Sequence, residues 1–180
     1  AIGYASMTFT MTATPLAMAA CGLSFGATKL VMQIHVLGMF VPSFFTGSLI
    51  KRFGVLEVML AGSALLVACI AVNAAGVSEL HFQAALLLLG VGWNFLYVGA
   101  STLLTEVAQP AERNKVQAVN DFSVFALVSL AAYTSGALHE WLGWQEANLG
   151  VLPAIALAAG MALWLRRRRP APAPAAASGR

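Results

Sequence analysis

Charged side chains are scarce in this sequence of 180 residues. Asp, Glu, Lys and Arg together make up 9% of it, while hydrophobic residues make up 59%. A soluble globular domain usually carries about 25% charged residues. So few charges cannot cover a surface that faces water. The composition therefore excludes an ordinary soluble domain and predicts that lipid surrounds most of the chain.

Cysteine and the common catalytic motifs are also nearly missing. Cys21 and Cys69 lie far apart in apolar stretches, so they supply neither a disulfide framework nor a metal site, and we expect two buried thiols. The sequence has no glycine-rich phosphate-binding loop, no G-x-S-x-G turn and no His/Cys cluster with metal-ligand spacing. It therefore predicts a protein that is not an enzyme and that has no cofactor or metal.

Long apolar runs, in contrast, fill the chain. Each is close to the ~20 residues that a helix needs to cross a bilayer, and backbone groups in lipid must be bonded within their own segment. The fold class predicted is all-α, a polytopic membrane protein with six transmembrane helices. We place the spans at roughly 2–21, 30–50, 55–76, 84–104, 116–138 and 147–165.

Positive charge is concentrated on one set of connections. Lys51, Arg52, Arg113, Lys115 and Arg166–Arg169 fall there, while only Lys29 falls on the opposite set. By the positive-inside rule, the 50s loop, the 105–115 loop and the C-terminus are cytoplasmic, as expected for a bacterial inner-membrane protein.

The two ends of the chain differ in character. Residues 166–180, "RRRRPAPAPAAASGR", are predicted to form a disordered basic and Pro/Ala-rich tail. Its arginines adjoin a span, so we expect contact with anionic headgroups and not with nucleic acid. The chain starts with Ala1 inside an apolar run, without a charged region typical of a signal peptide, and we expect a fragment.

Two short segments match at a constant offset of 89 residues. "TGSLIKRFGV" (46–55) aligns with "SGALHEWLGW" (135–144). The same offset lays 30–50 over 119–139 and 55–76 over 144–165, which predicts two three-helix repeats. Because three is odd, the second repeat is inverted in the membrane, and the basic pair Lys51-Arg52 becomes Glu140-Trp141.

The first of these segments resembles a known signature. "GSLIKRFG" is similar to the cytoplasmic loop motif G-x-L-x-D-R-x-G of the major facilitator superfamily, with matches at Gly47, Leu49, Arg52 and Gly54. Lys51 stands where the family usually has aspartate. The resemblance is to the C-terminal half of a twelve-helix transporter. It implies an N-terminal six-helix half missing from this sequence, and a solute path between the halves.

Charged residues near the cytoplasmic ends suggest a gate. "EVAQPAER" places Glu106 and Arg113 seven residues apart, as several branches of the family do. Asp121 shares a helical face with Gln117 and Asn120, and Arg52 and Arg113 are the expected cations on its side of the membrane. We predict a gating or charge network of Arg52, Glu106, Arg113 and Asp121, with a proton-carrying role for Asp121 as the alternative.

Polar side chains inside the predicted spans are candidates for solute binding, because such groups are costly in lipid. His35 in the second span, and Trp93, Asn94 and Tyr97 in the fourth, offer an imidazole, an indole, an amide and a phenol. An imidazole also titrates near neutral pH. The alternative for all four is hydrogen bonding between helices. Pro15, Pro42 and Pro153 lie within spans and are candidate bends.

We therefore predict secondary active transport of a small organic solute by alternating access, driven by a proton or solute gradient. The expected partners are the lipid bilayer, the missing half and the solute. A truncated or accessory membrane protein without transport activity of its own remains the alternative. An integral-membrane enzyme would need a catalytic cluster at one interface, and the sequence offers none.

Overall fold

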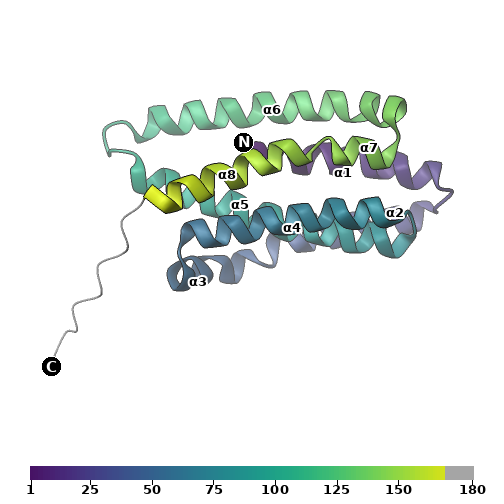
Figure 1. Cartoon of the computed structure of the whole chain (residues 1–180), viewed down its shortest axis with the longest axis horizontal. Helices are drawn as coiled ribbons and strands as arrows, with labels where there is room; N and C mark the ends of the chain where they lie inside the picture. The colour runs from purple at the N-terminus through teal and green to yellow at the C-terminus, as the bar shows by residue number, and fades with distance from the viewer. Residues whose placement is uncertain (169–180) are drawn as a thin grey trace.

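A computed structural model describes residues 1–168 of the chain, and this part is built from helices alone. Figure 1 shows the helices running roughly along one long axis. The eight helices of the described residues are α1 (Ile2–Ala20), α2 (Phe25–Phe40), α3 (Ser43–Phe53), α4 (Val55–Ala75), α5 (Glu79–Val107), α6 (Arg113–Leu142), α7 (Trp144–Leu149) and α8 (Leu152–Arg168).

The predicted all-α membrane architecture is confirmed. Of the described helical segments, α4, α5, α6 and the combined α7–α8 are long and apolar enough to span a membrane, and the bent pair α2–α3 adds a fifth if it counts as one. Helix α1 is not among them. The number six, together with the predicted domain limits, therefore remains a prediction.

Helix α1 carries threonine hydroxyls along its length. Thr8, Thr10 and Thr14 are buried, and Thr14 Oγ1 donates to its own helix at Thr10 O, 2.7 Å away. Such internal bonding lets a hydroxyl sit away from water. Helix α1 packs against α5 and α6, so it behaves as a packed inner helix.

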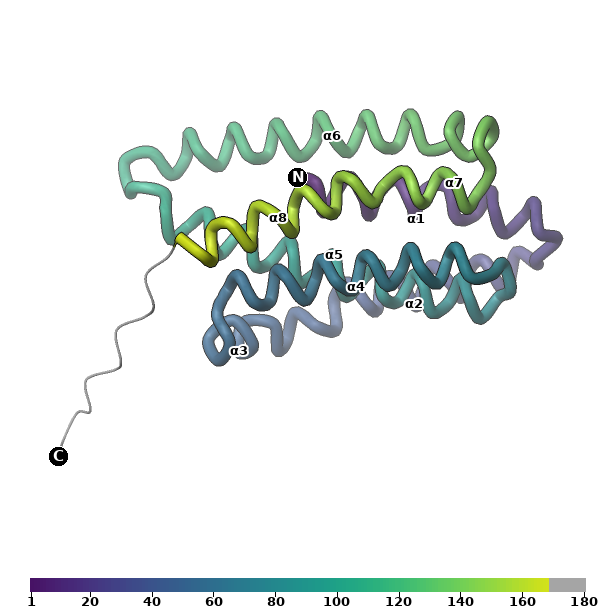
Figure 2. The backbone as a smooth tube through the Cα atoms, viewed as in Figure 1, coloured from purple at the N-terminus to yellow at the C-terminus, as the bar shows by residue number. Residues whose placement is uncertain are grey.

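Helix α5 lies at the centre of one group of helices and α1 links that group to α6. The main contacts of α5 are with α4, α2 and α1, whereas α6 contacts α1 and α7. The tube in Figure 2 shows α6 running apart from α4 and α5, with α1, α7 and α8 between them. Helix α6 is therefore joined to the group around α5 mainly through α1.

The predicted repeat has a counterpart in the backbone. Gly54 ends α3 with φ +99° and Gly143 ends α6 with φ +81°, and these two glycines are offset by 89 residues. A positive φ is easily reached only by glycine. The packing of α1 on α6 and of α5 on α2 is also the pairing that two inverted repeats require. Gly47, in contrast, lies inside α3 with open space where a Cβ would be.

Of the bends predicted at Pro15, Pro42 and Pro153, the structure shows one at Pro42. Helix α2 ends before Pro42, and α2 and α3 meet there at an angle of 42°, so the predicted bend is present. Helix α1 continues through Pro15. Pro153 falls in the first turn of α8, where a missing N–H costs little.

Helix ends extend beyond several predicted spans. The expected connection between the last two spans is helical except at Gly143, since α6 reaches Leu142 and α7 starts at Trp144. Arg166–Arg168 continue α8, so these three residues of the predicted tail are helical. The rest of that tail, 169–180, lies outside the described residues.

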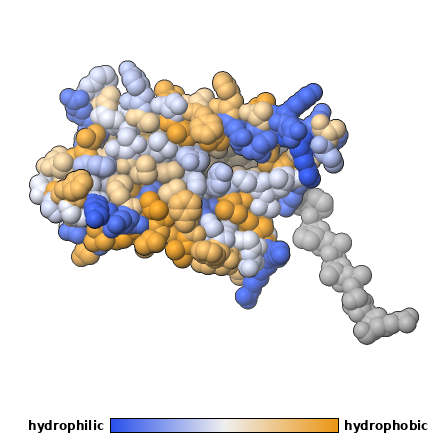
Figure 3. Space-filling model, turned by 180° about the vertical axis from the view of Figure 1, so that it is seen from behind, coloured by the Kyte–Doolittle hydropathy of each residue, from blue (hydrophilic) through white to orange (hydrophobic). Residues whose placement is uncertain are grey.

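The surface matches a lipid environment. Large apolar side chains such as Phe44, Phe122 and Tyr133 are more than three-quarters exposed. On the face seen in Figure 3, the most hydrophilic side chains lie toward the two ends of the long axis, and hydrophobic ones cover much of the middle. Water would disfavour such a surface, and a bilayer suits it.

Glycines bring α5 into backbone contact with its neighbours. A Cβ placed on Gly90 would lie 2.5 Å from the carbonyl oxygen of His35 and 2.9 Å from the carbonyl carbon of Gly38, both in α2. On the other side, a Cβ on Gly62 of α4 would lie 2.8 Å from the oxygen of Gly92. Small residues at helix contacts are how membrane helices approach closely.

We expect Gly90→Ala to destabilise the fold by about 1–3 kcal/mol, because the added methyl group meets backbone that cannot rotate away. The measurement is thermal unfolding of the purified full-length protein in detergent. Gly136→Ala is the matched control: it is also helical, but its Cβ would meet nothing within 4 Å. Equal melting temperatures for the two variants would contradict the backbone contact.

Candidate functional site

Asn94 lies on the side of α5 that faces α2 and α3, and both the nitrogen and the oxygen of its amide are hydrogen-bonded. It is 1% exposed. Its Nδ2 donates to Met39 O at 2.8 Å and to Ser43 Oγ at 2.6 Å. Its Oδ1 accepts from Thr46 Oγ1 at 2.7 Å. All three partners surround the break between α2 and α3.

The position of these bonds explains how the bend survives in lipid. Pro42 has no N–H, so the helix ladder fails there and leaves carbonyl groups without helical partners. An unpaired backbone group in hydrocarbon costs several kcal/mol. Asn94 Nδ2 supplies a donor for Met39 O, a carbonyl group at the end of α2 beside the break. The amide thus repairs the broken segment and fastens it to α5.

His35 also joins α2 to α5. It is fully buried, and its Nδ1 donates to Leu86 O over 2.9 Å, which fixes the proton on Nδ1. Its Nε2 is buried and has no hydrogen-bond partner among the described residues. The bond lies beside the contact between Gly38 and Gly90, so His35 and Asn94 hold α2 against α5 on either side of that contact.

Trp93 and Tyr97 face the other way, toward α1. Their rings stack 4.9 Å apart at an interplanar angle of 9°. Tyr4 of α1 stands edge-on to both, 5.3 Å from Trp93 and 6.0 Å from Tyr97 between ring centres. Trp93 is buried, whereas Tyr97 is 49% exposed. These three rings form the aromatic cluster, and Tyr97 is its accessible face.

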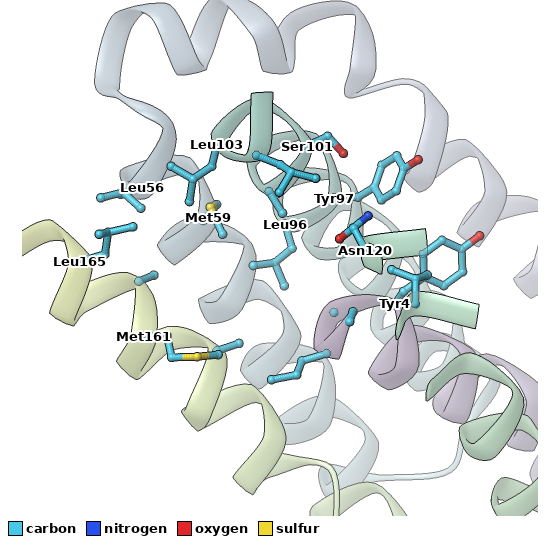
Figure 4. A pocket seen from close by; sticks show the side chains of 18 residues that line it. Tyr4, Leu56, Met59, Leu96, Tyr97, Ser101, Leu103, Asn120, Met161 and Leu165 are labelled. Carbon is cyan, nitrogen blue, oxygen red and sulfur yellow. The ribbon is translucent and has the colours of Figure 1, made fainter. Parts of the chain in front are cut away.

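The aromatic cluster borders a cavity of about 300 Å³ between α1, α4, α5, α6 and α8. Figure 4 shows Tyr4 and Tyr97 on one side of it with Asn120 between them, and Met161 and Leu165 on the far side. The cavity is apolar apart from this polar edge. A site of this size with few polar groups is suited to a small organic molecule.

The structure brings together two of the four predicted solute-binding residues. Trp93 and Tyr97 belong to the aromatic cluster, and Tyr97 lines the cavity. His35 and Asn94 are buried in the contact between helices. The alternation of faces along α5 causes this separation, because neighbouring positions 93 and 94 point about 100° apart on a helix.

The predicted charge network remains a prediction, and the structure shows the surroundings of two of its members, Asp121 and Arg52. Asp121 accepts hydrogen bonds from Gln117 Nε2 at 2.7 Å and Asn120 Nδ2 at 3.2 Å, both in its own helix. The guanidinium of Arg52 lies 5.1 Å above the ring of Phe53. Neither Arg52 nor Arg113 reaches Asp121 in an ion pair of the described chain.

An ion pair that the sequence did not suggest joins α4 and α8. Arg166 Nε and Glu57 Oε1 are 2.8 Å apart, with both side chains about half exposed. At the opposite end of α4, Asn73 Nδ2 donates to Asn148 Oδ1 of α7 over 3.1 Å. The outer helices of the two repeats are therefore fastened at both ends.

Sequence reasoning also missed Tyr4 and the part played by Asn120 in the cavity. Tyr4 sits among small and apolar residues without a motif around it, and Asn120 was considered only as a polar neighbour of Asp121. The only available signal was helical periodicity. Tyr97, Ser101 and Leu104 are spaced by three or four residues on one face, and all three line the cavity.

Comparisons with known proteins agree with this architecture. The family model described as Major Facilitator Superfamily matches residues 1–180. A riboflavin transporter of Brucella anthropi, RfnT, is 44% identical over 154 residues, which is 86% of this chain and 39% of that protein.

Two further relatives are uncharacterized MFS-type transporters of Bacillus subtilis. YdeG is 37% identical over 130 residues and YddS is 35% identical over 134 residues, covering 71% and 73% of this chain. The chain spans 29% to 39% of the length of these three relatives. With its apolar helices and a family match along its whole length, this multi-pass membrane chain belongs to the major facilitator superfamily, a family of transporters and not of enzymes.

Proposed function

We propose that this chain forms the C-terminal half of a secondary transporter that carries riboflavin or a similar flat heteroaromatic solute. The observation that carries the proposal is the 44% identity to a riboflavin transporter over 86% of the chain. A flavin has a flat conjugated ring with polar groups on its edge. The aromatic cluster and its polar neighbours suit such a ring.

Tyr97 is the residue proposed to touch the solute. It is 49% exposed, and the stacked Trp93 and edge-on Tyr4 hold its ring in one orientation. Aromatic rings favour offset stacking with other flat π-systems. The hydroxyl groups of Tyr4 and Tyr97 and the amide of Asn120 supply donors and acceptors for the ring edge.

Asn94 and His35 are proposed to support transport indirectly, without touching the solute. Both are buried and bonded across the contact of α2 with α5, so they set the bend that shapes the solute path. Broken helices at the interface of repeats are common near transporter binding sites, which supports a role for this bend in transport.

For transport itself we propose alternating access, in which this half rocks against an N-terminal half under a proton or solute gradient. The inner membrane of a bacterium is the proposed location, with the C-terminus in the cytoplasm, as the distribution of Lys and Arg favours. Arg52, Glu106, Arg113 and Asp121 lie at or near the ends of α3, α5 and α6 on this side. We propose that they form a charge network that holds the cytoplasmic end of the complete transporter closed.

Uptake of riboflavin by the full-length protein is the first test. A riboflavin-auxotrophic bacterium without an uptake system of its own should grow on low riboflavin when it expresses the protein. Labelled riboflavin should enter in a saturable manner, and a protonophore should reduce the rate if protons drive the process. Entry of another solute but not of riboflavin would refute the assigned substrate, and transport of none across a solute panel would favour an accessory role.

Tyr97→Ala should raise the KM for uptake about two- to tenfold, because an aromatic pair contributes about 0.5–1.5 kcal/mol. The melting temperature should change little, since Tyr97 as a residue is 49% exposed. Tyr133→Ala is the matched control, because Tyr133 is 85% exposed and does not line the cavity. The same KM in both variants would remove Tyr97 from the binding site.

Asn94→Ala should instead lower stability. Three bonds are lost, and hydrogen bonds between membrane helices average ~0.6 kcal/mol each, so we expect a loss of about 2 kcal/mol. Thermal unfolding in detergent measures it. The control is Asn120→Ala, whose amide bonds to Asp121 of its own helix α6. If Asn94→Ala melts like the parent, the amide does not hold the bend.

A further inference from the structure

The side chains that line the cavity beside the aromatic cluster carry no charge. Of the described residues, 18 line this space, and none of them is Lys, Arg, His, Asp or Glu. The polar side chains among them are those of Tyr4, Tyr97, Ser101 and Asn120. Two phenols, a hydroxyl and an amide carry no formal charge at neutral pH. The lining therefore recognises a solute by hydrogen bonds and apolar contact.

The cation that follows this lining along α8 is already paired. Arg166 comes directly after Leu165, a lining residue, and its Nε lies 2.8 Å from Glu57 Oε1. Glu57 in turn comes directly after Leu56, which lines the cavity from α4. The two opposite charges offset each other, so this pair presents little net positive charge to an anion.

A carboxyl group stands behind the polar edge of the cavity. Asn120 lies between Tyr4 and Tyr97 in Figure 4, and its Nδ2 donates to Asp121 Oδ1 over 3.2 Å. Gln117 Nε2 donates to the same oxygen at 2.7 Å. The carboxyl group of Asp121 is therefore one hydrogen bond away from a lining residue. As a carboxylate it repels an anion at this edge.

An anion in this cavity would lose water without gaining a partner of opposite charge. Moving an ionised group out of water is costly unless an opposite charge pairs with it. An uncharged heteroaromatic ring avoids this cost, because its carbonyl and N–H groups can exchange water for neutral partners such as Tyr97, Ser101 and Asn120. The lining thus separates solutes by charge even where their rings are identical.

We propose that this cavity accepts uncharged heteroaromatic solutes and excludes anionic ones. The inference rests on the proposed function, in which Ala1 of the lining continues by a peptide bond into the N-terminal half and has no free amino group. Riboflavin and its phosphate monoester, flavin mononucleotide, share one ring system, and the phosphate adds a charge of about −1.5 to −2 at pH 7. The cavity therefore takes riboflavin and rejects flavin mononucleotide.

Competition for riboflavin uptake by the full-length protein in proteoliposomes tests this selection. Flavin mononucleotide should need at least about a hundredfold higher concentration than unlabelled riboflavin for the same inhibition, because an unpaired buried charge is strongly disfavoured. A neutral ester of the same riboflavin hydroxyl group controls for bulk and should compete like riboflavin. Equal inhibition by riboflavin and flavin mononucleotide would overturn the charge selection, and weak inhibition by the neutral ester would assign the rejection to bulk.

A cation added to the lining should relax the selection. Ser101→Arg places a guanidinium at the polar edge, where it can bind a phosphate through two hydrogen bonds. Competition by flavin mononucleotide relative to riboflavin should improve at least about tenfold, since hydrogen bonds between charged groups are strong. Thr105→Arg is the matched control, because Thr105 is exposed one turn along α5 and does not line the cavity. The same selectivity in both variants would show that the lining does not set it.

Thiol labelling tests the charge selection without any solute. Ala158 lines the cavity, so Ala158→Cys in a full-length background without other cysteines introduces one thiol there. The comparison is the same background with Cys21 alone, which is exposed. The ratio of labelling rates for a neutral and an anionic methanethiosulfonate reagent should be at least about tenfold larger at position 158 than at Cys21, because the anion must shed its water there. Equal ratios would overturn the inference.

Failure of the substrate and failure of the charge selection give different results. If neither riboflavin nor flavin mononucleotide inhibits or enters, the assigned substrate is wrong, and the ratio of labelling rates still decides whether the cavity excludes anions. If riboflavin enters and flavin mononucleotide competes equally well, the substrate is right and the charge selection is refuted.

Discussion

Close contact of helix backbones at α5 is the constraint on which this bundle depends. Lipid is as apolar as a leucine side chain, so hydrophobicity does not drive membrane helices together, and packing and hydrogen bonds must. Gly90 and Gly92 let α2 and α4 approach α5 until main-chain atoms touch. His35 and Asn94 then bond across the contact with α2. The bend between α2 and α3 keeps its position because these contacts and bonds hold it against α5.

The same helix serves two purposes on its two faces. Asn94 faces α2 and α3, and its amide is hydrogen-bonded to them. Trp93 and Tyr97 face α1, and the ring of Tyr97 remains accessible. The rigid contact with α2 and α4 gives the aromatic cluster a fixed support. A binding surface gains affinity when its groups are already held in place. The packing of α5 on α2 and α4 therefore preorganises the aromatic cluster on its opposite face.

The sequence predicted the helices and their membrane setting well, because hydropathy alone decides which segments avoid water. The turn at Gly54 and its partner at Gly143 were also predictable, since the offset of 89 residues marked both. The division of roles among polar residues was not. In the sequence, Trp93, Asn94 and Tyr97 were equal candidates for solute binding. Only the tertiary contacts show that the amide of Asn94 bonds between helices while the rings of Trp93 and Tyr97 face α1. The Glu57–Arg166 pair was missed because it joins helices that are far apart in sequence.

The looser packing of α8 on α1 has a physical origin in the repeat. The offset of 89 pairs Gly38 with Leu127 and Gly62 with Val151. In the first repeat those glycines bring α2 and α4 against α5. In the second repeat the bulkier Leu127 and Val151 stand in their places, and both line a cavity of about 370 Å³ between α1, α6, α7 and α8. Helix α6 still packs on α1 about as extensively as α2 packs on α5, whereas α8 contacts α1 far less than α4 contacts α5. The looser packing of the second repeat therefore lies at the contact of α8 with α1. Two repeats with the same order of helices thus differ in one contact: the outer helix α4 of the first repeat packs tightly on α5, and the outer helix α8 of the second packs loosely on α1.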